Sequence, residues 1–372
     1  MHTPLFDPAD FAIAPATAHV CAGGEPAFLR RLGDAFARYG ADKTRGPAGR
    51  IAQDAVVQRV RAAAAALFGV AAEGIGFAPS VADGVSMVSE SLAWRAGDEV
   101  VLDGAEYPSV GVPFALLAAR PHLRLASGDA PDRLLRLIGP RTRVVALSYV
   151  SYLTGERIDL APLRAAADRV GALLLVDFTQ AAGVVPVAMD IADFAFAACY
   201  KFLLGTTGAA LAFWNRTRQP EWRAVSGGWY SLDPAAPRGY GAAPRLRRDG
   251  LCFSRGNPAF LALYMLEESL RYLADFPPAR IAAHAEALIA SLYPALLARG
   301  LIPTTPADPA RRAANLCIAP RDPAGMVDAL AAHGVLAWNG QGRVRFSFHG
   351  YNSAMDLQRI LAALDAIGEQ MH

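Results

Sequence analysis

Three short apolar runs dominate the middle of the chain. They are Leu173–Val176, Phe194–Ala198 and Ala209–Trp214, and each is bounded by glycine, proline or an acidic residue. Continuous apolar runs of this length are typical of strands that are buried on both faces of a parallel or mixed sheet. Asp177 directly follows the first run, and Lys201 lies just beyond the second. Ligands collect at the carboxyl ends of strands in open α/β sheets, so we expect these two side chains to converge on one crevice.

Asp177 and Lys201 are the residue types that an enzyme dependent on pyridoxal 5′-phosphate (PLP) requires. The lysine amine forms a Schiff base with the cofactor, and the carboxylate pairs with the pyridinium nitrogen. The alternative interpretation is that Lys201 is an ordinary lysine at a strand end and Asp177 a helix N-cap. Neither interpretation involves a metal site.

Helical periodicity appears in the N-terminal part. It begins near Pro26, breaks at Gly40 and resumes over Ile51–Val70. The basic loop between the two helical stretches carries arginines that are either solvated or directed towards an anionic substrate. Three prolines within residues 1–20 exclude a long helix there.

These patterns predict two domains and an arm. Residues 1–20 are expected to form an extended or loosely structured arm. A large domain over residues 21–257 carries the sheet. Helical periodicity returns from about Pro258, which predicts a smaller C-terminal domain over 258–372. At 372 residues the chain is long enough for this arrangement.

Composition narrows the functional classes. Hydrophobic residues make up 53% of the chain and charged residues 19%, which indicates a filled globular core. A net charge of +2 gives no reason to expect nucleic acid or a membrane surface as a partner. The N-terminus lacks the basic and apolar regions of a signal peptide. The four cysteines are scattered, as expected for reduced core thiols of a cytoplasmic protein.

Two motifs around the central runs carry a family resemblance. The segment D-F-T-Q-A-A-G begins at Asp177, and Y-K-F-L-L-G-T-T-G begins at Tyr200. Together they resemble the core of the class V aminotransferase family, which has PLP fold type I. The tyrosine before the lysine is similar to the kynureninase branch rather than to the cysteine desulfurases. G-T-T-G after the lysine departs from the G-G-P-G usual in that branch.

The resemblance implies an α/β fold. Its large domain has three layers (α/β/α) around a mostly parallel seven-stranded sheet, and its smaller C-terminal domain is α+β. The strand number comes from the resemblance and not from the apolar runs. The resemblance also implies a homodimer, because the family builds its active site from both chains.

Further motifs imply cofactor contacts. Ser80 and Val81 open a helix after a strand, where relatives hold the phosphate of PLP; alternatively, Ser80 is a plain N-cap. Tyr107, in E-Y-P-S, matches the aromatic residue that stacks on the pyridine ring, or is a simple turn aromatic. Tyr152 stands where desulfurases carry an asparagine, which leaves Gln180 to donate to the phenolate oxygen of PLP.

Later motifs complete the expected site. Tyr200 is assigned to the cofactor pocket, and Trp229 lies in a glycine-flanked loop similar to one near the phosphate in kynureninases. Asn257 takes the threonine position of a turn that reaches the partner's phosphate in relatives. Arg345 matches the arginine whose fork grips the α-carboxylate of the substrate. Arg343 points the same way in a strand of period two, so the roles of the two arginines are interchangeable at this level.

The expected activity is that of a PLP-dependent enzyme acting on a small α-amino acid through an external aldimine and a Cα carbanion. Lys201, Asp177 and Tyr107 are the expected catalytic residues, and transamination is the leading reaction. A kynureninase-like hydrolase or a C–S lyase acting by β-elimination is the alternative. Cysteine desulfurase is disfavoured because residues 334–345 lack a cysteine. A Rossmann dehydrogenase would need G-x-G-x-x-G, which is absent after the first strand, and a non-catalytic binding protein would not need both Asp177 and Lys201.

Overall fold

The computed structural model describes residues 2–370 with the exception of 119, 237–238, 240 and 242. Its centre is a seven-stranded sheet of order β2-β8-β7-β6-β5-β3-β4. Only β8 runs antiparallel to its neighbours in this sheet. The strands are β2 (Ile75–Ala78), β3 (Glu99–Asp103), β4 (His122–Ala126), β5 (Thr142–Ser148), β6 (Leu173–Asp177), β7 (Phe194–Ala198) and β8 (Ala210–Trp214). The expected mostly parallel seven-stranded sheet is therefore confirmed.

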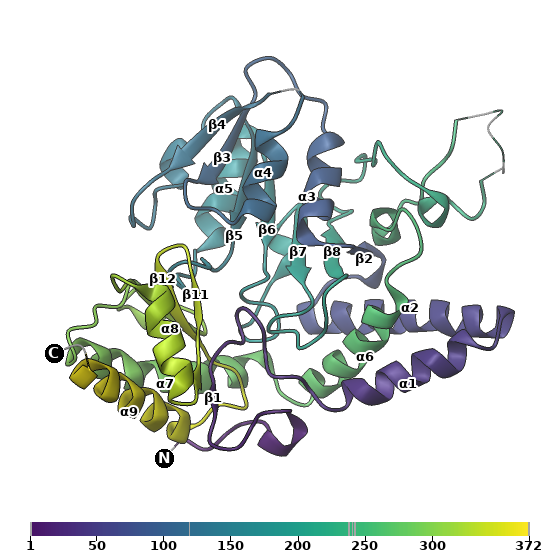
Figure 1. Cartoon of the computed structure of the whole chain (residues 1–372). Coiled ribbons are helices and arrows are strands. Elements are labelled where there is room, and N and C mark those ends of the chain that lie inside the picture. Colours follow the sequence, from purple (N-terminus) through teal and green to yellow (C-terminus); the bar gives the residue numbers. More distant parts are fainter. Residues whose placement is uncertain (1, 119, 237–238, 240, 242, 371–372) are drawn as a thin grey trace.

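Alternate residues of the central strands enter two separate cores, one on each face of the sheet. Leu173 and Leu175 pack with α3 (Val81–Glu90) and α4 (Pro108–Ala115), whereas Leu174 packs with α5 (Leu160–Val170) on the opposite face. A strand buried on both faces must be apolar at every position. This explains why the three runs are continuous and not alternating, and it gives the large domain its three layers (Figure 1).

Three long helices lie beside the sheet. They are α1 (Leu32–Lys43), α2 (Pro47–Phe68) and α6 (Phe260–Ala274). The prediction of a helix break at Gly40 is wrong, because α1 continues through Gly40 and ends three residues later. A side chain at Gly40 would meet no atom within 4 Å, so this glycine faces open space. The structure thus has a turn at 44–46, where Gly46 has a φ of +56°.

The C-terminal part has its own small sheet of order β11-β12-β9, which is antiparallel throughout. Its strands are β9 (Asn315–Ile318), β11 (Trp338–Gly340) and β12 (Arg343–Ser347), and its helices are α7 (Pro278–Leu297), α8 (Pro323–Ala332) and α9 (Ala354–Gln370). The N-terminal arm joins this part, because β1 (Ala18–His19) pairs in parallel with β10 (Val335–Leu336). The arm and α9 accordingly lie at the same end of the molecule (Figure 1).

None of the helices within the described ranges is both long enough and apolar enough to cross a membrane. The same ranges contain no group of three or more His, Cys, Asp and Glu side chains placed to hold a metal ion.

Candidate active site

A cavity of about 250 Å³ opens at the carboxyl ends of the central strands. Ser148 ends β5 and Asp177 ends β6, while Lys201 follows β7 by three residues. The structure brings most of the sequence-predicted site residues into this one cavity: Ser80, Val81, Tyr107, Asp177, Gln180, Tyr200 and Lys201 all line it. Arg345, Trp229 and Asn257 do not line it, although Arg345 contacts the lining residue Tyr152.

Asp177 is the fully buried acid of the cavity. Its Oδ1 accepts hydrogen bonds from the backbone N–H of Thr179 at 2.9 Å and from the Thr179 hydroxyl at 2.5 Å. Burial raises the pKa of this carboxyl, while the bonds from Thr179 and the charge of Lys201 oppose that shift. Among the described residues nothing donates to Oδ2. Asp177 therefore has one free oxygen, which suits a protonated ring nitrogen.

Lys201 lies under two aromatic rings. Its Nζ is 5.3 Å from the centre of the Tyr107 ring and 5.5 Å from that of Tyr200. Burial and the nearby positive charge of Arg345 lower the pKa of the amine to about 8, although Asp177 acts in the opposite direction. About a tenth of Lys201 is therefore neutral at pH 7, and hence nucleophilic and basic, which is far more than for an ordinary lysine.

Glu106 is a residue that sequence analysis missed. Its Oε1 accepts from the Tyr107 backbone N–H at 2.6 Å and from the Ser148 hydroxyl at 2.5 Å, and its Oε2 accepts from the Ser148 N–H at 2.8 Å. Tyr107 and Ser148 both line the cavity, and Ser148 lies beside Asp177 in the sheet. Burial raises the pKa of Glu106 to about 7 despite these bonds. Its place directly before Tyr107, the aromatic residue expected to stack on the ring, was the available signal.

The N-terminus of α3 forms another wall. Ser80 is the N-cap, and its hydroxyl accepts from the Asp83 backbone N–H at 3.2 Å and donates to the Asp83 carboxylate at 2.6 Å. The first amides of a helix have no partners within it and favour anions. Ser80 and Val81 line the cavity at this helix N-terminus. Ser80 is an N-cap, as the alternative interpretation expected, and the phosphate role of both residues stays a prediction.

Arg345 and Arg343 lie on β12, on the side of the cavity wall formed by Tyr152. Arg345 donates from Nη1 to the Tyr152 carbonyl at 3.0 Å, and the Arg343 guanidinium lies 5.1 Å from the centre of the Tyr152 ring. Burial lowers the pKa of Arg345 to about 10. Both side chains are almost excluded from solvent, and the Nε of each has no hydrogen-bond partner among the described residues.

Gln180 meets the N-terminal segment, a contact that sequence analysis did not anticipate. Its Nε2 donates to the Gly23 carbonyl at 2.8 Å, and its Oε1 accepts from Asn315 at 3.0 Å. A Cβ on Gly23 would come within 2.7–2.9 Å of Ser347, Gln180 and Asn315, so this position requires glycine. One N–H of the Gln180 amide remains for a ligand, and its bond to the phenolate oxygen stays a prediction.

Trp229 and Asn257 do not line the cavity of their own chain. Trp229 is 59% exposed, and Asn257 accepts a hydrogen bond of 2.8 Å from Arg50. Asn257 instead lines a neighbouring pocket that shares Thr207 with the cavity. The role of Asn257 at the phosphate of a partner chain and the role of Trp229 near a phosphate both stay predictions.

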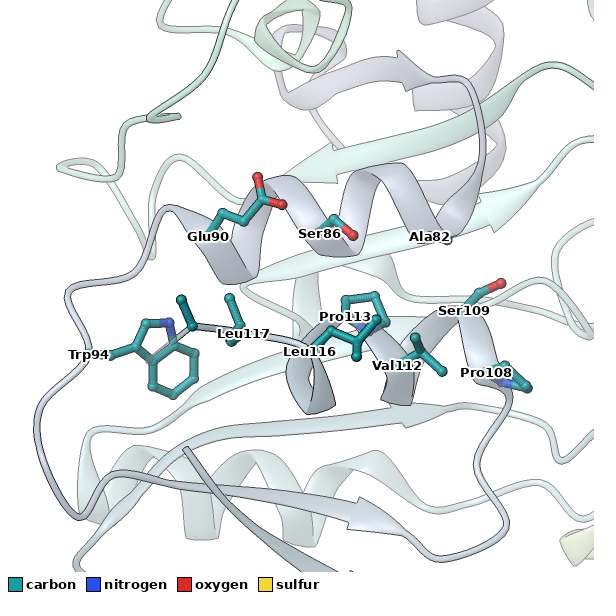
Figure 2. Close-up of a pocket in the computed structure, with 11 residues that line it drawn as sticks. Ala82, Ser86, Glu90, Trp94, Pro108, Ser109, Val112, Pro113, Leu116 and Leu117 are labelled. Carbon is teal, nitrogen blue, oxygen red and sulfur yellow. The ribbon is translucent and has the colours of Figure 1, made fainter. Parts of the chain in front are cut away.

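A larger apolar groove of about 850 Å³ adjoins the cavity at Ser109, which lines both. Figure 2 shows Val112 of α4, and Leu116 directly after this helix, below Ser86 and Glu90 of α3. The described residues that line this groove include no basic side chain and no nucleophile other than serine, so we place the chemistry of the site in the smaller cavity.

The donor set of the smaller cavity fits PLP. It offers a partly neutral amine for the aldehyde, a buried carboxylate with a free oxygen for the ring nitrogen, an aromatic side chain for the ring face and helix amides for the phosphate. Each feature matches one part of the cofactor.

The family model described as Aminotransferase class-V matches residues 25–360. A probable cysteine desulfurase of Pseudomonas putida is 30% identical over 299 residues, which cover 73% of this chain and 72% of that protein. A kynureninase of Deinococcus radiodurans is 31% identical over 60% of this chain and 56% of its own length.

Solved structures share the fold. The apo structure of a cysteine desulfurase from Thermococcus onnurineus NA1 superposes with a TM-score of 0.89 at 20% identity, and covers 100% of this chain and 99% of that one. A variant of a cystine C–S lyase with glycine covalently linked to its PLP cofactor superposes with a TM-score of 0.82 at 22% identity, over 96% and 99% of the two chains.

Proposed function

Since the chain belongs to the class V aminotransferase family of PLP-dependent enzymes, we propose that it acts on a small α-amino acid and that its reaction is transamination. One observation carries the proposal. The Lys201 amine has its pKa lowered to about 8 and lies in the same cavity as the buried Asp177 and the ring of Tyr107. The cavity therefore holds a single amine that can both attach the cofactor and move a proton.

Each residue of the cavity has its own role in binding the cofactor or moving a proton. Asp177 keeps a ring nitrogen protonated through its free oxygen, and Tyr107 covers the ring face. Ser80 and Val81 hold the phosphate through the amides of α3. When bound, PLP withdraws electrons from the bond that breaks at Cα. Lys201 would take the Cα proton as a general base and return a proton to the cofactor carbon on the far side of the substrate nitrogen, two atoms from Cα, which is the shift that transamination requires.

Arg345 orients the substrate. Its guanidinium is buried and its Nε is free, so it can bind the α-carboxylate as a planar fork. Fixing the carboxylate fixes the direction of the Cα–H bond relative to Lys201, which is a contribution of positioning.

The state of the thiols argues against a persulfide relay of the desulfurase type. Cys21, Cys199, Cys252 and Cys317 are all buried. Burial raises the pKa of each thiol, to about 12 for Cys21, Cys199 and Cys252. A thiol that is buried and protonated is a poor nucleophile.

A lyase or kynureninase-like hydrolase is the second candidate. Tyr152 and Tyr200 line the cavity, and the kynureninase similarity covers 60% of this chain. Both reactions use the same Cα deprotonation by Lys201, and they differ in which bond breaks next. We infer that the protein acts as a homodimer, because Trp229, which the family resemblance places near a phosphate, is exposed outside the cavity of its own chain. We also infer that it works in the cytoplasm with reduced thiols.

The decisive experiment follows the visible absorption band of the purified holoprotein. Amino acids are added alone, or together with pyruvate or 2-oxoglutarate. Bleaching that recovers only with a keto acid means transamination, whereas ammonia, alanine or sulfide released without an acceptor means a lyase or hydrolase. A Lys201→Ala variant that retains the wild-type band, or a wild-type protein that gains no band when PLP is supplied, would overturn the proposal.

A further inference from the structure

Six arginines are buried in the part of the chain that the structure describes, and two of them differ from the rest. Arg61, Arg133, Arg164 and Arg312 each form an ion pair with at least one carboxylate. Arg343 and Arg345 form none with any described residue, although they are only 4% and 2% exposed. A buried guanidinium without a counter-charge retains the free-energy cost of its desolvation. An anion that binds beside these two arginines would offset that cost.

Both arginines lie on the face of the small sheet that meets the cavity. Arg343, Arg345 and Ser347 are alternate residues of β12 and therefore share one face. Ser347 is paired with Asn315 of β9, and the Asn315 side chain donates to Gln180 in the cavity wall. Four buried polar atoms on these two strands have no partner among the described residues: Arg343 Nε, Arg345 Nε, Ser347 Oγ and Asn315 Oδ1.

The groups around Arg343 leave its charge unbalanced. Its Nη1 donates to the Gly340 carbonyl, and its guanidinium lies on the ring of Tyr152, which lines the cavity. Cys317 is close to both arginines, yet burial raises the pKa of its thiol and keeps it neutral. Tyr152 itself packs edge to face on Tyr107, with 4.9 Å between ring centres. The Tyr152 side chain therefore lies between Arg343 and the Tyr107 ring, and the Tyr107 ring in turn faces Lys201.

We propose that the substrate is an acidic α-amino acid, and that Arg343 binds its side-chain carboxylate while Arg345 binds the α-carboxylate. This inference rests on the proposed function. An α-carboxylate neutralises one guanidinium, and the helix amides of α3 serve the phosphate, which leaves Arg343 for a second anion. Same-face neighbours on a strand lie about 7 Å apart, a spacing suited to two carboxylates separated by two or three carbon atoms, as in aspartate or glutamate. Tyr152 must rotate to admit the side-chain carboxylate to Arg343.

The test measures binding to the holoprotein through the change in the cofactor absorption band. L-aspartate is compared with its neutral isostere L-asparagine, and L-glutamate with L-glutamine. The wild type is expected to bind one acidic ligand about 10- to 100-fold more tightly than its isostere, the range typical of a buried charge pair. In Arg343→Met the acidic ligand loses most of that advantage, while L-alanine loses far less affinity than the acidic ligand does.

Thermal unfolding with and without ligand gives a second readout that does not depend on turnover. Acidic ligands are expected to raise the melting temperature of the wild type more than their isosteres, and to lose this excess in Arg343→Met. Arg343→Lys, which keeps the charge without the fork, is the second variant and should retain part of the preference.

Two failures are distinguishable. If L-alanine binds and shifts the band but both acidic ligands bind no better than their isosteres, this inference is wrong and the proposed function stands. If no amino acid perturbs the band, the proposed function fails, and this inference with it.

Discussion

Buried arginines occur in two kinds of surroundings in this protein, and the contrast separates scaffold from site. In the scaffold, Arg133 Nε lies 2.8 Å from Asp103 and its Nη2 lies 2.9 Å from Glu156. On β12, Arg343 and Arg345 have backbone carbonyls and the Tyr152 residue as neighbours instead. The scaffold balances its charges internally, which preserves stability. The site leaves cations unbalanced, which costs stability and favours the binding of anions.

The largest expected effect on activity comes from Lys201, which is the third basic residue of the site beside Arg343 and Arg345. Lys201→Ala should lower turnover by about 10²- to 10⁴-fold or more, because it removes the group that moves the Cα proton. The free energy of unfolding of the apoprotein should change far less than the activation free energy, because Lys201 forms no ion pair with a described residue. Steady-state kinetics and thermal unfolding of the same variant check both statements. If the variant is less stable but the folded fraction keeps wild-type turnover, Lys201 has no catalytic role.

One matched pair of substitutions tests whether the two kinds of buried arginine affect stability differently. Arg133→Met should lower the free energy of unfolding by about 3 kcal/mol, at the lower end of the range for a broken buried pair, because Asp103 loses its cationic partner while Glu156 keeps Arg311. Arg345→Met removes a buried charge that has no counter-charge, so the apoprotein should be as stable as the wild type or more stable. Urea unfolding of the two apo variants measures the difference.

The two variants should also differ in ligand binding, in the opposite sense. Arg345→Met is expected to weaken amino-acid binding strongly, whereas Arg133→Met should bind normally at temperatures where it is folded. Equal destabilisation by both substitutions would mean that Arg345 is a structural residue like Arg133.

The pH dependence of cofactor attachment tests the charge excess at Lys201. Burial and Arg345 lower the pKa of the amine to about 8, and only the neutral amine attacks the cofactor aldehyde. The rate at which apoprotein takes up PLP should therefore rise about tenfold per pH unit below 8 and level off above it. In Arg345→Met the break should move to higher pH, because a positive neighbour is lost. A rate that is flat between pH 6 and 9 would contradict the lowered pKa.

Much of the fold could be predicted from local sequence, because burial on both faces leaves a direct signal. The run Leu173–Val176 became β6 with one additional residue, and Phe194–Ala198 became β7 without change. The continuation of α1 through Gly40 could not be predicted from the local sequence. A glycine weakens a helix by only about 1 kcal/mol, and the contacts of α1 with α6 lie more than 200 residues apart in sequence.

The site was predictable where motifs carry it and not where distant segments meet. Asp177 and Lys201 follow strands, so sheet topology brings them together. The contact of Gln180 with Gly23 spans 157 positions and has no local signature. Likewise the equivalence of Arg343 and Arg345 follows from the period of a strand, but the absence of an ion pair at both, among the described residues, needed the structure.

The smallest expected effect is on cofactor affinity and comes from Glu106, which we compare with the paired carboxylates of the scaffold. Glu106 is a half-buried carboxylate that, unlike Asp103 and Glu156, has no basic partner among the described residues, and its three hydrogen bonds hold Tyr107 and Ser148 at the cavity. In Glu106→Gln an amide NH₂ replaces one acceptor oxygen and faces N–H donors, so PLP affinity should fall about tenfold, as expected for a lost hydrogen bond to a charged group. Glu90→Gln, on an exposed part of α3, makes the same charge change away from these bonds and should bind PLP like the wild type.

The pH at which this difference appears is also fixed by the structure. Burial raises the pKa of Glu106 to about 7, and the protonated carboxyl, like the amide, loses acceptor capacity. Above about pH 7 the wild type should bind PLP more tightly than Glu106→Gln, and the gap should close as the pH falls below that value. Absorbance titrations of the two apoproteins with PLP between pH 6 and 8.5 measure the gap. A gap independent of pH would mean that Glu106 acts through its shape alone, and an equal loss in Glu90→Gln would mean that net charge, not the bonds to Tyr107 and Ser148, sets the affinity.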